Sequence, residues 1–427
     1  MGVTFDYSGA AVLVTGGTSG IGHGIATAYR DAGAAVTITG TRAAPDEYDT
    51  ELTGLAETYA GYFIPEAVPP IVEFYRPVLV GRNADDIPTL AADLFHTGRY
   101  WARVGLGLAV ITALEAALWD LRGKELGQPV HQLLGGPKHE RLLGYATGGG
   151  SVWPVDQQFA KIDYYRSLGF RATKFGTGAT TPEGEDLVQS EPAAAADFEA
   201  EKLARVRAHV GPTFKVALDG HQDNPLGARP WKLATATAVV EAVEPFDLFF
   251  FEEALPYTDP WGYRELRRVN DVPIAGGETL AGVQEWRVFA DQDAFDMAQP
   301  DAAFCGGLGE FLAIAELFAS HGRRIATHSW GAGGALMQNL HAAFAAPNTM
   351  VVELPPGMGP LHTEIVGDSF VFRDGHVLPP ETPGLGIQLP QSVRDRFPFV
   401  PGSGEFNPVP GKPLTDLGYP DLVEASR

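Results

Sequence analysis

The sequence predicts an α/β protein whose main body is a parallel (β/α) barrel. Beyond Gly136, short apolar segments alternate with helical patterns, as expected for parallel strands with helices packed outside them. Most of these segments end in a polar or charged residue, and barrels of this kind place their catalytic groups where strands end. The predicted strands are LLGYAT, RATKF, FKVALD, LFFFE, PIAGG, DMAQP, RIATH and MVVEL.

The chain divides into four predicted segments. Residues 1–50 show a strand, a glycine-rich turn, a helix and a second strand, which together predict one Rossmann-like βαβ unit. Residues 51–136 are mainly helical in pattern and predict a small capping domain. The barrel is predicted over residues 137–384, and residues 385–427, rich in Pro and Gly, are expected to pack on the cap or the barrel.

Composition indicates a globular protein of the cytoplasm. Hydrophobic residues make up 45% of the 427 residues, and the net charge of −22 disfavours nucleic acid and anionic membranes as partners. No uninterrupted apolar run reaches the length of about 18 residues typical of a membrane helix. The start MGVTFDYSG lacks the features of a secretory signal, and the single Cys305 cannot form an internal disulfide.

Three carboxylates mark the ends of consecutive predicted strands. Asp219 closes VALD, Glu252 closes FFFE and Glu278 follows IAGG, each about one strand-helix unit apart. Consecutive barrel strands would bring these groups together, and oxygen donors without thiols suit Mg²⁺. Acids at strand ends can also simply cap the following helices, although three of them in register make that interpretation less favourable.

Three further polar residues continue the series around the barrel. They are Asp301 in AQPD, His328 in RIATH and Glu353 in MVVEL. A carboxylate on one strand can hydrogen-bond a histidine on the next, orienting the ring and raising its basicity. Lys174, in ATKF, is expected to face this dyad from the other side of a bound substrate. A lone lysine or histidine in a barrel is more often structural, but this pairing with three carboxylates favours catalysis.

Two motifs before the barrel carry a family resemblance. The segments GLAETYAGYFIPEAVPPIVEFYRPVLVG and ITALEAALWDLRGKELGQPVHQLLGG resemble the mandelate racemase subgroup of the enolase superfamily, and the resemblance extends over residues 54–390. It implies a modified (β/α)7β TIM barrel, an α+β capping domain and a Mg²⁺ cofactor. It also implies a role for each matching residue: metal ligands Asp219, Glu252 and Glu278, a catalytic dyad of Asp301 and His328, and a substrate contact from Glu353.

The sequence departs from the family pattern at several positions. Ala254 stands where the family usually has proline, which leaves Glu253 as a less favoured metal ligand. Ala172 replaces the first lysine of the KxK pattern of family racemases, and Asp301 stands where a cycloisomerase-type member has lysine. The junction near residues 49–54 falls where the family would have completed its first cap strands. Those strands, which normally carry a loop that covers the active site and selects substrate, are therefore expected to be missing and replaced by the N-terminal fragment.

The resemblance implies that Lys174 or His328 abstracts the proton α to a carboxylate, giving an enediolate that the metal stabilises. His221, in LDGHQD, resembles the general acid of some acid-sugar dehydratases, although it could equally contact only substrate or a ligand carboxylate. We therefore expect a lyase that dehydrates a sugar acid, a small-molecule carboxylate, to a 2-keto-3-deoxy acid, and that forms a homo-oligomer. The alternatives are a racemase or epimerase of a 2-hydroxy acid and, least favoured, an inactive barrel serving as an oligomerisation scaffold.

A second resemblance concerns the N-terminus. VLVTGGTSGIGHGIA resembles the opening of a short-chain dehydrogenase/reductase, whose glycine-rich turn admits a pyrophosphate, and Arg42 would suit the 2′-phosphate of NADP. An NADP-dependent reductase or NADP-binding module is therefore the alternative from another class. However, no tyrosine in the chain has a lysine four residues later, as such a reductase requires. We expect a βαβ relic without a cofactor.

Overall fold

The computed structural model of the protein describes residues 53–147, 154–179, 181, 187, 189–223, 230–355 and 360–399, and the backbone of two strands nearer the N-terminus. The chain forms two compact units. The first comprises residues 1–130 together with 382–427, and the second comprises residues 131–381.

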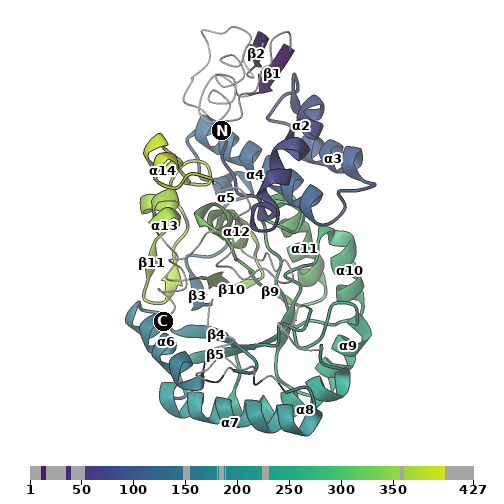
Figure 1. Cartoon of the computed structure of the whole chain (residues 1–427), viewed down its shortest axis with the longest axis vertical. Coiled ribbons are helices and arrows are strands. Elements are labelled where there is room, and N and C mark those ends of the chain that lie inside the picture. Colours follow the sequence, from purple (N-terminus) through teal and green to yellow (C-terminus); the bar gives the residue numbers. More distant parts are fainter. Residues whose placement is uncertain are drawn as a thin grey trace, which may run out of the picture. The chain divides into compact units, whose positions relative to one another are not determined.

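The second unit contains a closed barrel of eight parallel strands, which confirms the predicted fold class (Figure 1). The strands follow one another around the barrel in sequence order, and the pairing of the last strand with the first closes it. A short antiparallel hairpin of β11 (Phe372–Arg373) and β12 (His376–Val377) extends the sheet beside the first strand. The barrel strands are β3 (Leu142–Ala146), β4 (Ala172–Gly176), β5 (Lys215–Asp219), β6 (Phe251–Glu252), β7 (Ile274–Gly276), β8 (Met297–Ala298), β9 (Arg324–Ala326) and β10 (Thr349–Leu354).

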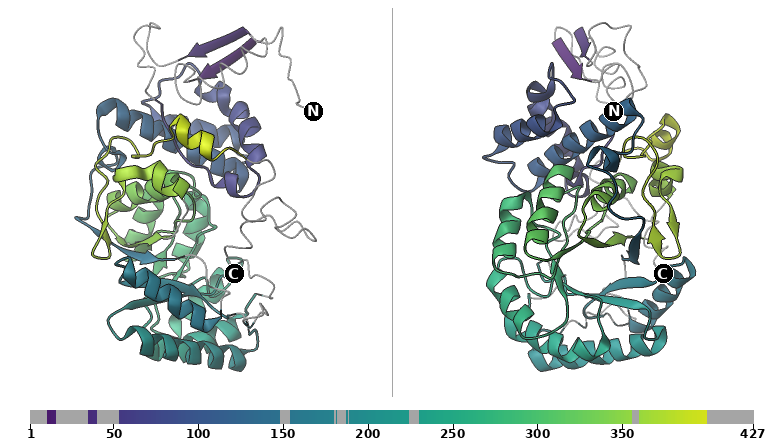
Figure 2. Two further views of the ribbon diagram at one scale, coloured as in Figure 1. Left: turned by 60° about the vertical axis from the view of Figure 1, so that its left-hand side comes forward. Right: turned by 180° about the vertical axis from the view of Figure 1, so that it is seen from behind.

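Helices connect the strands and surround them, as the two views in Figure 2 show. Each crossover returns the chain to the same end of the barrel, so all eight strands point the same way. The helices are α6 (Val155–Ser167), α7 (Pro192–Val210), α8 (Leu233–Val243), α9 (Pro260–Arg268), α10 (Gly282–Asp291), α11 (Leu308–Ser320), α12 (Gly333–Ala345) and, after β10, the short α13 (Pro360–Val366).

The interior of the barrel is an apolar layer to which every strand, or the residue beside it, contributes one side chain. These buried side chains are Tyr145, Ala172, Ala217, Phe250, Ala275, Met297, Ala326 and Val351. Because strand side chains alternate, the residue two positions further along each strand faces inward again. Those next positions are Thr147, Lys174, Asp219, Glu252, Gly277, Gln299, His328 and Glu353. The apolar layer is therefore the floor on which the candidate site lies.

The first unit is built around the long helix α4 (Leu106–Leu126), with α2 (Val68–Leu79), α3 (Ile87–Gly98) and, from the C-terminal segment, α14 (Gln391–Arg396). The buried carboxylate of Asp120 on α4 accepts hydrogen bonds from the amides of Leu55, at 2.7 Å, and Leu385, at 2.6 Å. Lys124 pairs with the same carboxylate at 2.6 Å. Burial raises the pKa of Asp120, although the positive charge of Lys124 opposes this shift. Asp120 thus ties two segments that are distant in sequence to one helix.

Two strands of the N-terminal segment are described, β1 (Ala11–Thr15) and β2 (Ala35–Thr39). They pair in parallel, with Ala11 opposite Ala35, as a βαβ unit requires. The predicted glycine turn, the predicted helix and Arg42 lie outside the described residues. Among the helices of the described part of the chain, none has the length and hydrophobicity needed to cross a membrane.

Candidate active site

Lys174 lies at the centre of a buried cluster of carboxylates. Its Nζ is 2.5 Å from Glu252 Oε1, 3.1 Å from Asp219 Oδ2 and 3.2 Å from Glu353 Oε1. Register explains this convergence, because β4, β5 and β6 are neighbours and Asp219 pairs directly with Glu252. Burial alone would lower the pKa of Lys174, but the three negative charges hold it well above its usual value. The side chain is therefore an ammonium ion in this arrangement.

The carboxylates of this cluster crowd one another. Burial raises the pKa of Glu252 to about 8, and the neighbouring charges of Asp219, Glu353 and Glu278 act in the same direction, whereas Lys174 opposes them. The second oxygen of Glu252 accepts a hydrogen bond from Gln299 Nε2. The cluster thus holds more negative charge than Lys174 compensates, which is the electrostatic condition that favours a further cation.

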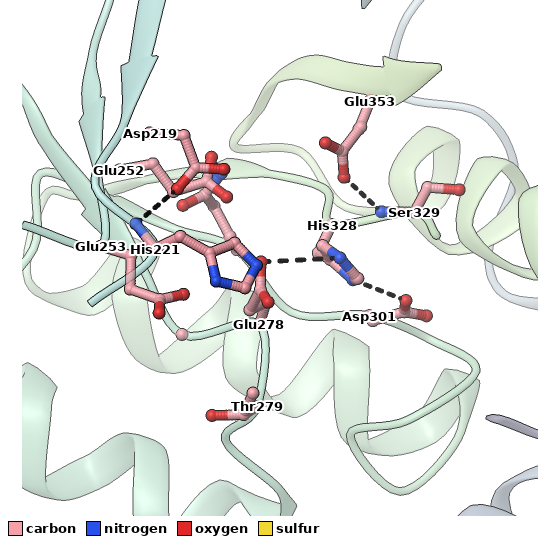
Figure 3. A network of polar contacts seen from close by, with 12 residues as sticks. Asp219, His221, Glu252, Glu253, Glu278, Thr279, Asp301, His328, Ser329 and Glu353 are labelled. Carbon is pink, nitrogen blue, oxygen red and sulfur yellow. Dashed lines mark hydrogen bonds and ion pairs between the residues drawn. The ribbon is translucent and has the colours of Figure 1, made fainter. Parts of the chain in front are cut away.

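Glu278 lies on the side of the site nearer His328. It follows β7 by two residues, after Gly277, whose φ of 113° is in a region that L side chains rarely adopt. A Cβ on Gly277 would collide with the ring of Trp286, so only glycine fits this turn. Glu278 Oε2 is 3.6 Å from His328 Nε2, and in Figure 3 Glu278 appears between the pair of Asp219 and Glu252 and the histidine.

The three predicted ligands, Asp219, Glu252 and Glu278, have the donor chemistry that Mg²⁺ prefers, since all are carboxylates from adjacent strand ends. Within the described ranges, no group of three or more His, Cys, Asp or Glu side chains stands in an arrangement that could hold a metal ion. The chemistry and the excess negative charge of the three carboxylates fit a divalent cation. In this structure, however, the ammonium group of Lys174 contacts both Asp219 and Glu252. The predicted metal site therefore stays a prediction.

His328 and Asp301 form a buried hydrogen-bonded pair. Nδ1 of His328 is 2.8 Å from Oδ2 of Asp301, within the predicted range of about 2.6 to 3.2 Å. The other oxygen of Asp301 accepts hydrogen bonds from Asn339 Nδ2 on α12, at 2.8 Å, and from the Ala303 amide, at 2.7 Å. Burial would lower the pKa of His328, but the charges of Glu278, Asp301 and Glu353 raise it to about 10.

Glu353 connects the lysine cluster with the strand of the histidine. Its Oε2 accepts a hydrogen bond of 2.7 Å from the Ser329 amide, and its own amide donates to Thr327 Oγ1 at 2.9 Å. Burial would raise the pKa of Glu353, but Lys174 and His328 lower it overall. Glu353 is thus an ionised carboxylate within the site, at the place where the sequence predicts a substrate contact.

His221 follows β5 by two residues in a left-handed conformation, with φ of 48°. Its amide donates to Asp219 Oδ1 at 2.9 Å, and its side chain is exposed. In Figure 3 the imidazole points toward the same region as Glu278. The position agrees with a residue at the mouth of the site, while the predicted role as an acid stays a prediction.

Several polar residues of the site were not predicted from the sequence. Gln299 is fully buried, binds Glu252 and lies between Met297 and Asp301 in an alternation that would have identified it as inward-facing. Asn339 orients Asp301 from a helix, and no pattern in the strand sequence points to it. Tyr145 lies in the floor, with its ring centroid 5.9 Å from Lys174 Nζ.

Comparison with known families agrees with this architecture. Residues 51–135 match the model described as mandelate racemase / muconate lactonizing enzyme, N-terminal domain. Residues 159–393 match the model described as enolase C-terminal domain-like. Neither match reaches residues 1–50, and the resemblance of that segment to a short-chain dehydrogenase is not supported by the comparisons.

Relatives of known name include both dehydratases and cycloisomerases. A D-galactonate dehydratase family member from Streptomyces bingchenggensis is 31% identical over 346 residues, covering 76% of this chain and 82% of the relative. The L-talarate/galactarate dehydratase of Salmonella typhimurium is 30% identical, covering 74% of this chain and 72% of the relative. The crystal structure of the 3,6-anhydro-D-galactonate cycloisomerase from Zobellia galactanivorans has a TM-score of 0.71 and 27% identity, covering 82% of this chain and 92% of that one.

The two matching models cover the described cap helices and nearly all of the barrel. Dehydratases are hydro-lyases, so the relatives of that name agree with the predicted lyase class. The barrel, the polar residues at its strand ends and the matches therefore lead to one assignment. The chain belongs to the mandelate racemase/muconate lactonizing enzyme family of the enolase superfamily.

Proposed function

We propose that this protein is a Mg²⁺-dependent dehydratase that converts a sugar acid to a 2-keto-3-deoxy acid. The observation that carries the proposal is the position of His328, with one ring nitrogen 2.8 Å from Asp301 and the other 3.6 Å from Glu278. A proton-transfer group oriented by a carboxylate thus adjoins a proposed metal ligand. Removal of a proton α to a carboxylate needs such a group beside the place where negative charge develops.

The residues proposed to hold Mg²⁺ are Asp219, Glu252 and Glu278. A bound Mg²⁺ would stabilise the charge that develops on the substrate carboxylate when its α-proton leaves. Glu353, an ionised carboxylate beside the site, is proposed to accept a hydrogen bond from a substrate hydroxyl. The layer of apolar side chains below closes the site from that side and keeps these groups in a poorly hydrated environment.

His328 is favoured over Lys174 as the group that removes the α-proton. Lys174 Nζ has three carboxylate partners within 3.2 Å, one for each of its N–H donors, so it is more fully engaged than the imidazole of His328. His328 Nε2 has a longer contact of 3.6 Å and faces Glu278. Lys174 would then hold the three carboxylates around it in place. His221, on the exposed side of the site, is proposed to protonate the departing hydroxyl.

A racemase or epimerase of a 2-hydroxy acid is the second candidate. It is favoured by the presence of two protonatable groups, Lys174 and His328, within one site, because inversion needs two groups that exchange a proton with the same carbon. Dehydration instead needs one base for the α-proton and an acid that protonates the leaving β-hydroxyl, so that water is released. The family relatives also include cycloisomerases.

The test is a panel of sugar acids incubated with the full chain, with and without Mg²⁺. Formation of a 2-keto acid, detected by semicarbazide absorbance and lost on chelation, is the expected result. The His328→Asn variant should form no product, and its thermal unfolding should show that it remains folded. If the protein inverts the α-centre without releasing water, the racemase proposal replaces the dehydratase proposal. If product forms equally well after chelation, the proposed dependence on Mg²⁺ is wrong.

A further inference from the structure

A hydrogen-bond network connects the loops that follow β5, β6 and β7, the three strands whose ends carry the proposed ligands. The network lies outside the cluster centred on Lys174, and the mechanism above uses none of its side chains. Its side chains are those of Asp223, Glu253, Tyr257 and Thr279, with the backbone amide of Gly277.

Tyr257 joins the second loop to the third. Its Oη accepts a hydrogen bond from the Gly277 amide at 2.6 Å and donates one to Glu253 Oε2 at 3.3 Å. The ring is nearly buried and stacks against Tyr263, with ring centroids 6.0 Å apart. Gly277 directly precedes Glu278, so the hydroxyl of Tyr257 holds the backbone from which that carboxylate extends.

Asp223 joins the first loop to both others. Its amide donates to Glu253 Oε1 at 2.6 Å, and its Oδ1 accepts from the Tyr257 amide at 2.9 Å. Its Oδ2 accepts from Thr279 Oγ1, on the far side of Glu278, at 3.2 Å. Both oxygens of Glu253 are therefore engaged within the network.

Backbone strain occurs where the network acts. His221 and Glu253 both have left-handed conformations, with φ of 48° and 45°, and Gly277 has φ of 113°. Non-glycine residues occupy that region only where their surroundings compensate the cost. The Glu253 carbonyl accepts a hydrogen bond from the Gln222 amide at 3.1 Å, so the two strained turns are bonded together next to the ligands.

We propose that Asp223, Glu253 and Tyr257 are positioning residues that fix the spacing of Asp219, Glu252 and Glu278 and thereby set the affinity of the protein for a divalent cation. The inference rests on the proposed function, because it takes these three carboxylates as the ligands. Outer groups that orient metal ligands typically change metal affinity by about 10 to 100-fold when removed.

The test compares two variants that each lose one buried phenol oxygen. Tyr257→Phe removes the hydroxyl that bonds Gly277 and Glu253, whereas Tyr263→Phe removes the neighbouring hydroxyl, which bonds only the backbone of Leu255 in the described structure. Isothermal titration of the full chain with Mg²⁺ should show affinity about 10-fold weaker, or more, in Tyr257→Phe and within about 2-fold of wild type in Tyr263→Phe. Thermal unfolding of both variants separates loss of stability from loss of affinity.

A second variant keeps the inference testable if Tyr257→Phe does not fold. Thr279→Val replaces only the hydroxyl that bonds Asp223 and should also weaken Mg²⁺ binding, by less than Tyr257→Phe. Equal Mg²⁺ affinity in Thr279→Val and wild type, an equal loss in both tyrosine variants, or a wild-type protein that binds no Mg²⁺ would overturn the inference. If Mg²⁺ binds and Tyr257→Phe weakens it, but no sugar acid is consumed, the inference stands and the proposed function fails.

Discussion

Asp301 holds His328 through one carboxylate oxygen, at 2.8 Å, while Asn339 of α12 holds its other oxygen at the same distance. The orientation of the imidazole therefore depends on a helix as well as on two strands. Replacing Asp301 by Asn removes the acceptor charge but keeps the size of the side chain. Turnover should fall by about 10² to 10⁴, the usual contribution of an oriented acid or base. Steady-state kinetics and α-proton exchange in D₂O would measure this, and unchanged exchange would show that the dyad is not the base.

His221 is expected to separate proton abstraction from elimination. In His221→Asn, exchange of the α-proton with D₂O should continue, because exchange needs only the metal and the base. Formation of the 2-keto acid should slow by about 10² to 10⁴, since hydroxide leaves poorly without an acid. NMR of the substrate together with a product assay measures both steps on one sample. Normal dehydration by this variant would assign the acid to another residue.

Asp120 is expected to be critical for the stability of the first unit. Asp120→Ala leaves the Leu55 and Leu385 amides and the Lys124 ammonium without their shared partner. Loss of one member of such a buried group should cost about 3 kcal/mol or more. The matched control is Glu125→Ala on the same helix, which removes an exposed pair with Arg122 and should cost about 1 kcal/mol or less. Urea unfolding of both variants gives the difference.

The loss of folding stability at acid pH is expected to depend in part on Asp293. Burial would raise its pKa, but hydrogen bonds and charge from Arg323 and Arg267 lower the pKa below its usual value. A depressed pKa gives stability that is present above that value and is lost as the pH falls through the lower, folded-state pKa. Thermal unfolding should therefore show a larger deficit of Asp293→Asn relative to wild type at pH 6 than at pH 2. Arg323→Gln should reduce that deficit, and an equal deficit at both pH values would contradict the assignment.

Residues 1–50 are expected not to bind NADPH. A dinucleotide normally spans two βαβ halves, and the sequence predicts only one. Calorimetric titration of the full chain with NADPH should show no binding in the micromolar range. Micromolar affinity that disappears in Gly20→Ala or Gly22→Ala would mean that the segment is a working cofactor site.

The sequence predicts the barrel and most of the site because side chains along a strand alternate, so that every second residue faces the interior of the barrel. Ala217 and Asp219, or Ala326 and His328, are successive inward positions, the first apolar and the second polar, so a strand pattern alone places the polar residue above the floor. Gln299 follows the same alternation, but because its side chain is uncharged the sequence does not indicate it as a candidate site residue.

Other features depend on distances across the structure rather than along a strand. Lys174 meets Glu353 through the closed barrel, and nothing in the spacing of the two residues indicates that one ammonium contacts three carboxylates. The left-handed conformation of Glu253 is equally hidden, because a glutamate is not a residue that favours positive φ. To predict that Asn339 orients Asp301, one would need to know which face of α12 contacts the strand ends.

The carboxylate of Asp120 has a consequence for the order in which the protein can be completed during synthesis. Its donors include the amide of Leu55, made early, and that of Leu385, which follows the entire barrel sequence. The first unit is thus interrupted in the chain by the second, whose residues 131–381 leave the ribosome before the last partner of Asp120 does. The amide of Leu385 is therefore the last of the donors to Asp120 to be synthesised, and a chain truncated before Leu385 would lack that hydrogen bond.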